Sequence, residues 1–179
     1  MALTVVVFDV GETLVDEATT YELWEAERTT EFVFADRDLH TDALPCLAAL
    51  RARGLRLGAA GNMHAVHEDF LRPHVDFVGS SERWGVRKPG AGFFARVAEE
   101  AGAPAGEIVY VGDRVDNDVL PALAAGLHAV RIRRGAHAHV ESPAGAAPDL
   151  PQNWLQHREG RAGEVRFALY RRAGSSAKL

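Results

Sequence analysis

Ten residues near the start of the chain decide its fold: Val5-Val6-Val7-Phe8-Asp9-Val10-Gly11-Glu12-Thr13-Leu14. The run before Asp9 is continuously apolar and rich in β-branched side chains, which predicts a strand buried on both faces of a sheet. The carboxylate of Asp9 ends this run. Open α/β sheets bind ligands beyond the carboxyl ends of their strands, so Asp9 is a candidate functional residue. The alternative is that Asp9 caps the following turn, since Asp and Gly together are common in loops.

The composition suits one globular domain. The chain has 179 residues, of which 47% are hydrophobic and 25% are charged, enough to bury an apolar core. A net charge of −5 and a pI near 5.9 argue against general nucleic-acid binding. The first apolar run lacks a preceding basic region and ends early, unlike a signal peptide, and no segment approaches the ~20 apolar residues that span a bilayer. These features predict a cytoplasmic protein without a membrane partner.

Three further side chains are predicted to have no chemical role. Cys46 is the only cysteine, which excludes an intrachain disulfide or thiolate metal cluster. Its apolar helical surroundings predict a small buried side chain rather than a nucleophile. His64 and His67 have a spacing that metal ligands also use, but no third ligand is indicated, so we expect solvated or capping histidines.

Strand and helix patterns alternate along the chain. Helices are predicted over 19–34, 42–53 (capped by Asp42), 63–71, 93–101 and 116–125, and further strands over 55–60, 75–78, 107–111 and 127–132. This alternation predicts a three-layer, Rossmann-like α/β fold, a parallel sheet with helices on both faces. Residues 1–134 would form this core, and 135–179 would be a linker and C-terminal extension packed on or near it. Alternation over 165–170 predicts an additional edge strand, which would cover this sheet or pair with a second copy in a homodimer.

Four features with chemically active residues follow one another along the chain near predicted strand ends. They are Asp9, the Gly61-Asn62 turn, Lys88 within Arg87-Lys88-Pro89, and the acidic run Gly112–Asp118. This set resembles the haloacid dehalogenase superfamily of aspartate-nucleophile hydrolases, most of which are phosphatases. The resemblance extends from about Val5 to Ile132. It implies a Rossmann-like core, and it marks residues 14–41 as a vestigial cap region, because many relatives insert a whole cap domain there. A minimal or absent cap would leave the site open to large substrates.

The resemblance implies catalytic roles for five residues. Asp9 would be the nucleophile, which attacks phosphorus to form an aspartyl phosphate. Lys88 would neutralise the phosphoryl group and the nucleophile. Thr13 would stabilise the nucleophile loop, although capping by its hydroxyl explains it equally well. Gly61 and Asn62 would hold the phosphoryl group through backbone N–H groups.

The resemblance also implies a magnesium site. Its ligands would be the carboxylates of Asp9, Asp113 and Asp118 and the backbone carbonyl of Gly11, all hard oxygen donors that suit Mg²⁺. Asp118 would either bind the ion directly or orient the ligands around it. Asp116 is instead expected to provide charge at a helix N-terminus.

Two glycines depart from the family pattern. Gly11 stands where phosphatases of the superfamily carry a second aspartate, the general acid and base, and such assistance is typically worth ~10²–10⁴-fold in rate. Glu12 is not expected to replace it, because its backbone directs it elsewhere. Gly61 stands where the family has Ser or Thr, and one lost hydrogen bond to a charged group costs roughly 1.5–3 kcal/mol. Together the two changes predict a slow enzyme or a protein that binds phosphate without catalysis.

The predicted function is Mg²⁺-dependent hydrolysis of a phosphomonoester through an aspartyl-phosphate intermediate. The substrate would be a phosphorylated small molecule with a good leaving group or a larger phosphate-bearing molecule. The alternative is a pseudoenzyme that binds phosphate or a phosphorylated partner through Lys88 and the metal site. Dehalogenase-like chemistry is a weaker alternative, because it needs a desolvating cap and no metal.

Overall fold

The computed structural model describes residues 2–17, 33–134, 154–162 and 165–172. Its strands form a seven-stranded sheet in the order β3-β2-β1-β4-β5-β7-β6. The first five strands are parallel, which confirms the predicted α/β sheet. The strands are β1 (Val5–Phe8), β2 (Arg56–Gly61), β3 (Phe77–Ser80), β4 (Ile108–Gly112), β5 (His128–Arg133), β6 (Trp154–Ala162) and β7 (Val165–Arg172).

The described helices are mostly short. They are α2 (Ala43–Ala52), α3 (Glu68–Leu71), α4 (Ser81–Trp84), α5 (Ala91–Ala101) and α6 (Leu120–Ala124), with 3₁₀ turns at Asp36–Asp38, Ala65–His67 and Ala105–Glu107 and a π-helical turn at Val115–Val119. The helix predicted over 63–71 is therefore a 3₁₀ turn followed by one α-helical turn. The helix predicted over 19–34, and with it most of the predicted cap region, lies outside the described residues.

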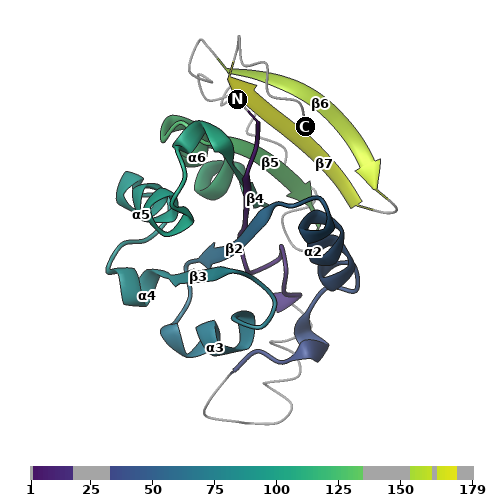
Figure 1. The fold of residues 1–179 in the computed structure, drawn as a ribbon, viewed down its shortest axis with the longest axis vertical. Helices are drawn as coiled ribbons and strands as arrows, with labels where there is room; N and C mark the ends of the chain where they lie inside the picture. The colour runs from purple at the N-terminus through teal and green to yellow at the C-terminus, as the bar shows by residue number, and fades with distance from the viewer. Residues whose placement is uncertain (1, 18–32, 135–153, 163–164, 173–179) are drawn as a thin grey trace.

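Helices cover both faces of the sheet (Figure 1). Helices α4, α5 and α6 lie on one side, and α2 lies on the other. Val5 and Val7 pack in the same core cluster as Phe93 of α5, whereas Val6 and Phe8 belong to the cluster on the opposite face. The apolar run of β1 does not alternate because both of its faces are buried. Each such side chain stabilises the fold by about 1.5–3 kcal/mol.

An antiparallel hairpin extends the sheet beyond β5. Strand β7 pairs with β5 from Ala129↔Tyr170 to Arg133↔Arg166, and β6 pairs with the other side of β7. The predicted C-terminal strand therefore covers the sheet of its own chain. The prediction that this strand, β7, forms the edge of the sheet is wrong, because β6 lies beyond it at the edge. The sequence of β6 lacks alternation, so its strand conformation follows from pairing with β7 rather than from a local pattern.

Helix α2 differs from its prediction in two side chains. Cys46 is exposed, because the buried positions of α2 are Ala43 and Leu47, one turn apart. Asp42 stands at the N-cap position, but its carboxylate makes no capping hydrogen bond. It accepts two hydrogen bonds from Arg134, at 2.8 and 2.6 Å. This ion pair links the start of α2 to the residue after β5.

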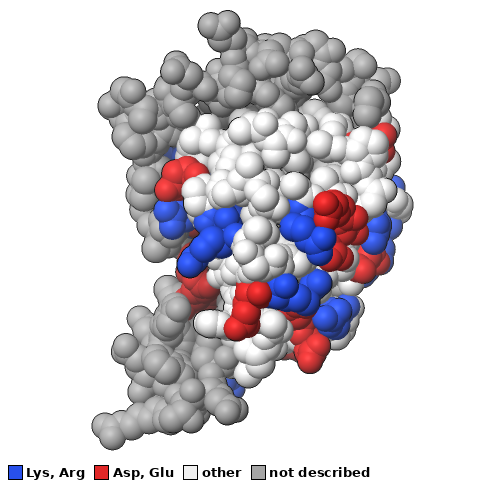
Figure 2. All heavy atoms as spheres, turned by 90° about the vertical axis from the view of Figure 1, so that its left-hand side faces the viewer, with Lys and Arg blue, Asp and Glu red and all other residues white. Residues whose placement is uncertain are grey.

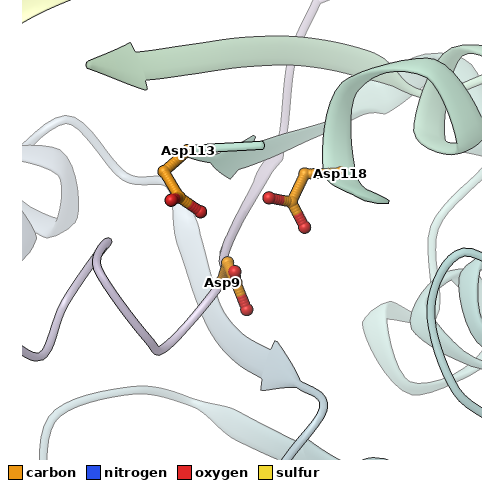
Figure 3. Close-up of side chains that lie close together, drawn as sticks. All are labelled: Asp9, Asp113 and Asp118. Carbon is orange, nitrogen blue, oxygen red and sulfur yellow. The ribbon is translucent and has the colours of Figure 1, made fainter. Parts of the chain in front are cut away.

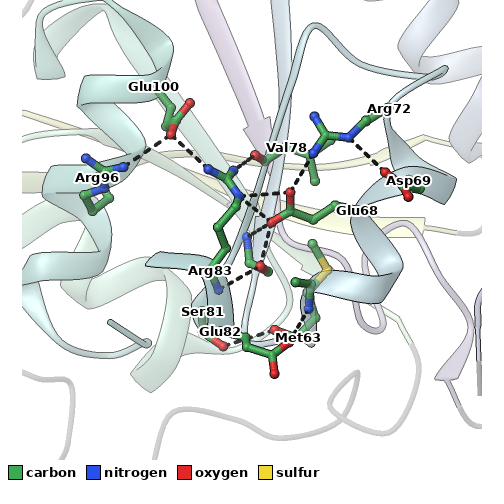
Figure 4. Close-up of polar contacts among 12 residues, drawn as sticks. Met63, Glu68, Asp69, Arg72, Val78, Ser81, Glu82, Arg83, Arg96 and Glu100 are labelled. Atoms are coloured by element: carbon green, nitrogen blue, oxygen red, sulfur yellow. Dashed lines mark hydrogen bonds and ion pairs between the residues drawn. The ribbon is translucent and has the colours of Figure 1, made fainter. Parts of the chain in front are cut away.

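A buried carboxylate organises the end of β3 (Figure 4). Oε1 of Glu68 accepts hydrogen bonds from the backbone N–H of Ser80 at 3.0 Å, the Ser80 hydroxyl at 2.6 Å and Arg83 Nε at 2.8 Å. Its other oxygen accepts one from Arg72 at 3.0 Å. These contacts join α3, β3 and α4, and they hold the segment that leads to Lys88.

The face that carries α4 and α5 has charges of both signs close together (Figure 2). Arg96 pairs with Glu99 and Glu100, and Arg83 also reaches Glu100 at 3.5 Å. This face therefore has no extended area of one charge. None of the helices in the described ranges has the length and apolar character needed to cross a bilayer.

His67 is buried rather than solvated or capping. Its ring stacks on Phe34 with centroids 4.1 Å apart and an interplanar angle of 28°. Burial lowers the pKa of His67 below its ordinary value. The folded protein thus favours the neutral imidazole.

We expect this histidine to make the fold less stable in acid. The unfolded chain takes up the proton at the ordinary pKa of about 6.5, whereas the folded chain resists it, so the free energy of unfolding falls as the pH is lowered through that value. Thermal unfolding from about pH 7 to about pH 5 should give a shallower decline for His67→Leu than for the unaltered protein. Equal slopes would contradict this role for His67.

Candidate active site

The candidate site lies where the strand order reverses. From β1 the chain proceeds to β2 and β3 on one side of the sheet and to β4 and β5 on the other. The carboxyl ends of β1 and β4 therefore flank a topological switch point, the usual ligand site of open α/β sheets. Asp9 directly follows β1, and Asp113 directly follows β4. The Asp9 N–H donates to the Val111 carbonyl at 2.7 Å, which continues the ladder to the site.

Three buried carboxylates meet at this point: Asp9, Asp113 and Asp118 (Figure 3). One oxygen of each lies within 4.8 Å of the others. Asp118 reaches the cluster because the chain widens into the π-helical turn before α6, where the N–H groups of Asp118 and Val119 both donate to the Arg114 carbonyl. Such π-bulges often occur at functional sites. The sequence predicted an ordinary helix here.

A buried lysine binds two of these carboxylates. Lys88 Nζ lies 2.7 Å from Asp9 Oδ1 and 2.6 Å from Asp118 Oδ1, and the residue is only 4% exposed. The ammonium also lies 5.6 Å from the ring centroid of Tyr110. The hydroxyl of Tyr110 donates to the Ala60 carbonyl at 2.7 Å, which fixes that ring. The lysine is thus held in a desolvated environment, where its electrostatic interactions with nearby charges are strong.

The pKa values reflect this crowding of charge. Burial raises the pKa of Asp9 to about 7; Lys88 opposes the shift, and the neighbouring charge of Asp118 adds to it. Burial disfavours the charged form of Lys88, but Asp9 and Asp118 outweigh burial and raise its pKa. The lysine therefore stays protonated and neutralises one of the three carboxylate charges. The remaining negative charge is what a divalent cation would balance.

Asn62 positions the lysine. Its side-chain N–H donates to the Lys88 carbonyl at 3.0 Å, and its Oδ1 accepts the Lys88 N–H at 2.8 Å. The peptide bond between Lys88 and Pro89 is cis. The side chain of Asn62 is thus engaged with the backbone of Lys88, and the predicted phosphate-binding role rests on the Gly61-Asn62 backbone.

The Asp9 carboxylate lies so close to Gly61 that only glycine fits at this position without a shift. A Cβ at this position would lie 2.8 Å from Asp9 Oδ1, closer than side-chain contacts allow. The missing side chain therefore gives room to the candidate nucleophile. The family's Ser or Thr at this place would require the Asp9 carboxylate to move.

The turn after Asp9 is tightly closed. The N–H groups of Thr13, Leu14 and Val15 all donate to the Val10 carbonyl, at 3.3, 2.9 and 2.9 Å. Glu12 has a φ of 55°, a left-handed conformation uncommon outside glycine and often found at functional sites. The Thr13 hydroxyl is buried and has no hydrogen-bond partner among the described residues, so capping by this hydroxyl is not observed.

The three aspartates of the acidic loop, Asp113, Asp116 and Asp118, have different surroundings. Both oxygens of Asp118 have partners, Lys88 on Oδ1 and the Arg114 N–H on Oδ2 at 2.9 Å. This arrangement suits an orienting role better than direct binding of a metal. The backbone carbonyl of Asp113 accepts a hydrogen bond from the buried Arg131 at 3.2 Å. Asp116 is exposed and pairs with Arg114 at 2.7 Å, outside the carboxylate cluster, and it lies in the first turn of the π-helical segment, as its predicted role at a helix N-terminus requires.

A cavity of about 280 Å³ opens onto these groups. Most of the predicted site residues line this cavity, together with residues that the sequence did not single out. The lining residues are Asp9, Val10, Gly11, Glu12, Glu17, Phe34, Gly61, Asn62, Met63, Arg87, Lys88, Asp113, Arg114 and Asn117. Thr13 and Asp118 lie behind this surface. Glu17 carried no sequence signal, because only the path of the loop brings it to the cavity.

Comparisons with known proteins agree with this geometry. Residues 85–153 match the family described as HAD-hydrolase-like. The chain is 39% identical over 114 residues to a glyceraldehyde 3-phosphate phosphatase of Methanopyrus kandleri, covering 60% of this chain and 49% of that protein. The chain thus spans about half the length of the curated relatives it matches.

Two solved structures show the same fold. A HAD phosphatase from Thermococcus onnurineus has a TM-score of 0.60 and 20% identity, covering 71% of this chain and 85% of that one. The HAD-hydrolase YfnB of Bacillus subtilis, solved bound to magnesium, has a TM-score of 0.58 and 16% identity, covering 72% and 86%. With the aspartate, lysine and acidic motifs in the expected order at the expected strand ends, these matches lead to one conclusion. The chain is similar in sequence and fold to phosphatase-like hydrolases of the haloacid dehalogenase superfamily.

Proposed function

We propose that the protein is a Mg²⁺-dependent phosphatase that hydrolyses phosphomonoesters through an aspartyl phosphate on Asp9. One observation carries the proposal: the Asp9 carboxylate lies 2.7 Å from a buried lysine, at the switch point of the sheet. Phosphoryl transfer chiefly requires positioning and charge neutralisation, and this arrangement supplies both.

In the proposed reaction, one oxygen of Asp9 attacks phosphorus and forms an acyl phosphate. Lys88 holds the non-bridging oxygens and stabilises their charge. Asn62 keeps Lys88 in place through its two backbone hydrogen bonds. Water then cleaves the acyl phosphate and regenerates Asp9.

The donor set fits a magnesium ion. Asp9 and Asp113 offer hard carboxylate oxygens from a buried cluster that carries excess negative charge, and Gly11, whose carbonyl is a further predicted ligand, lines the same cavity. Asp118 would orient this set through Lys88 and the Arg114 backbone. The ion, when bound, would supply further neutralisation of the phosphoryl oxygens.

We expect Mg²⁺ to stabilise the folded protein. A ligand at one hundred times its Kd adds about 2.7 kcal/mol to the free energy of unfolding. Thermal unfolding with and without Mg²⁺ should therefore show a higher midpoint with the ion. Asp113→Asn should lose most of this gain, whereas Asp116→Asn, outside the cluster, should keep it. An equal gain in both variants would contradict the assigned ligands.

The substrate in this proposal is a small phosphorylated molecule. The relatives named glyceraldehyde 3-phosphate phosphatase support a short phosphorylated carbon chain. Arg87 and Arg114 line the cavity together with Lys88, so the site presents cationic groups to an anionic substrate.

The test is hydrolysis of an aryl phosphate, with and without Mg²⁺. Turnover that requires the ion is the expected result. A second candidate function, phosphate binding without catalysis, is favoured by the missing side chain at Gly11. Retention of inorganic phosphate without any turnover would support that function and refute the phosphatase.

A further inference from the structure

The side-chain volume of position 11 is filled although Gly11 has no side chain. A Cβ at Gly11 would lie 2.4 Å from Glu17 Oε1, 2.5 Å from its carboxyl carbon and 2.8 Å from Oε2. The whole carboxylate of Glu17 therefore stands where a side chain of residue 11 would begin. It is partly exposed and lines the cavity together with Asp9 and Lys88.

The turn after Asp9 accounts for this placement. Three successive N–H groups bind the Val10 carbonyl, and a bridge joins Gly11 to Val15, so the chain folds back over its own start. Residue 17 thereby returns to residue 11. Glu12 also lines the cavity, but it is the carboxylate of Glu17 that occupies the position-11 volume.

We propose that Glu17 is the general acid and base of the reaction, a carboxylate supplied from the next turn of chain in place of the absent side chain at position 11. This inference rests on the proposed phosphatase function. It also changes the meaning of Gly11, because any side chain at this position would collide with the Glu17 carboxylate.

The proton balance is simple. As Asp9 attacks phosphorus, the bond from phosphorus to the ester oxygen breaks, and the Glu17 carboxylic acid gives its proton to that oxygen to release an alcohol. The Glu17 carboxylate then takes a proton from water, whose oxygen attacks the acyl phosphate. The bond from phosphorus to Asp9 breaks, inorganic phosphate leaves, and both side chains return to their first state.

The test compares two leaving groups in Glu17→Gln, which keeps the size of the side chain but cannot exchange the proton. Hydrolysis of an alkyl phosphate should fall by about 10²–10⁴-fold. An aryl phosphate with a good leaving group needs no acid in the first step, so the variant should still release one equivalent of the phenol in a burst. Acid quenching should then recover the phosphoryl enzyme, because its hydrolysis lacks a base.

The control variant is Glu99→Gln, an exposed glutamate on α5 that is expected to behave like the unaltered protein. A second variant pair tests the space itself. Gly11→Asp alone should place its side chain against the Glu17 carboxylate, and Glu17→Ala alone should be slow. Combined, they should regain alkyl-phosphate turnover, since the aspartate then has room.

The outcomes separate the two proposals. Mg²⁺-dependent aryl-phosphate turnover in the unaltered protein, with no loss of alkyl-phosphate turnover in Glu17→Gln, overturns the role of Glu17 and leaves the phosphatase standing. A folded Glu17→Gln that loses the burst as well gives Glu17 a structural role and also overturns it. Absence of turnover in the unaltered protein overturns both proposals.

Discussion

Asp9→Asn is expected to abolish Mg²⁺-dependent aryl-phosphate hydrolysis, lowering kcat/KM by at least about 10⁴-fold, as removal of a nucleophile does elsewhere. The amide cannot form an acyl phosphate. The substitution is nearly isosteric, and the amide oxygen can still accept the hydrogen bond from Lys88. The variant should therefore fold. Because burial already raises the pKa of Asp9 to about 7, a neutral group there should not reduce the free energy of unfolding without metal.

The measurement is steady-state hydrolysis beside acid-quenched labelling with a phosphate-labelled substrate. The unaltered protein should carry the label on Asp9 and Asp9→Asn should carry none. Asp116→Asn is the matched control, since this aspartate is exposed and forms its ion pair with Arg114, outside the carboxylate cluster. Comparable turnover in Asp9→Asn and the unaltered protein would refute the assigned nucleophile.

Lys88→Met is expected to damage both catalysis and the fold. The lysine bridges Asp9 and Asp118 at 2.7 and 2.6 Å in a buried place. Removing one partner of a buried ion pair typically costs about 3–5 kcal/mol, because the remaining charge is left without compensation. Here two carboxylates lose their partner at once. Without metal, the pKa of Asp9 should rise further, since Lys88 is the largest influence that lowers it.

Chemical denaturation with and without Mg²⁺ measures this effect. Arg96→Met, which removes surface ion pairs of α5 and a cation–π contact with Trp84, should change the free energy of unfolding by only about 0–2 kcal/mol. Combining Lys88→Met with Asp118→Asn should restore part of the lost stability, because one stranded charge is removed. Turnover should stay low in both variants. A Lys88→Met protein as stable as Arg96→Met would show that the carboxylates do not depend on the lysine.

Local sequence was enough to predict the five-stranded parallel sheet and the strand ends at which chemistry gathers. A strand buried on both faces must be continuously apolar, as Val5–Phe8 is, and a carboxylate directly after it lies at the ligand-binding edge whatever the loops do. The same reasoning placed Asp113 after β4. The C-terminal pair of strands was only half predicted, because β6 has no alternating pattern and owes its conformation to β7.

The local sequence pattern was sufficient to place Asp9, Lys88 and Asp113 near the carboxyl ends of the strands. The contacts that hold them there follow only from the tertiary structure. Asn62 clamps the backbone of Lys88 from 26 residues away, and the carboxylate of Glu17 enters the space above Gly11. Strand ends follow from local apolar patterns, whereas these contacts depend on the path of two loops. That path is set by packing and by main-chain hydrogen bonds between distant residues, and no local pattern records it.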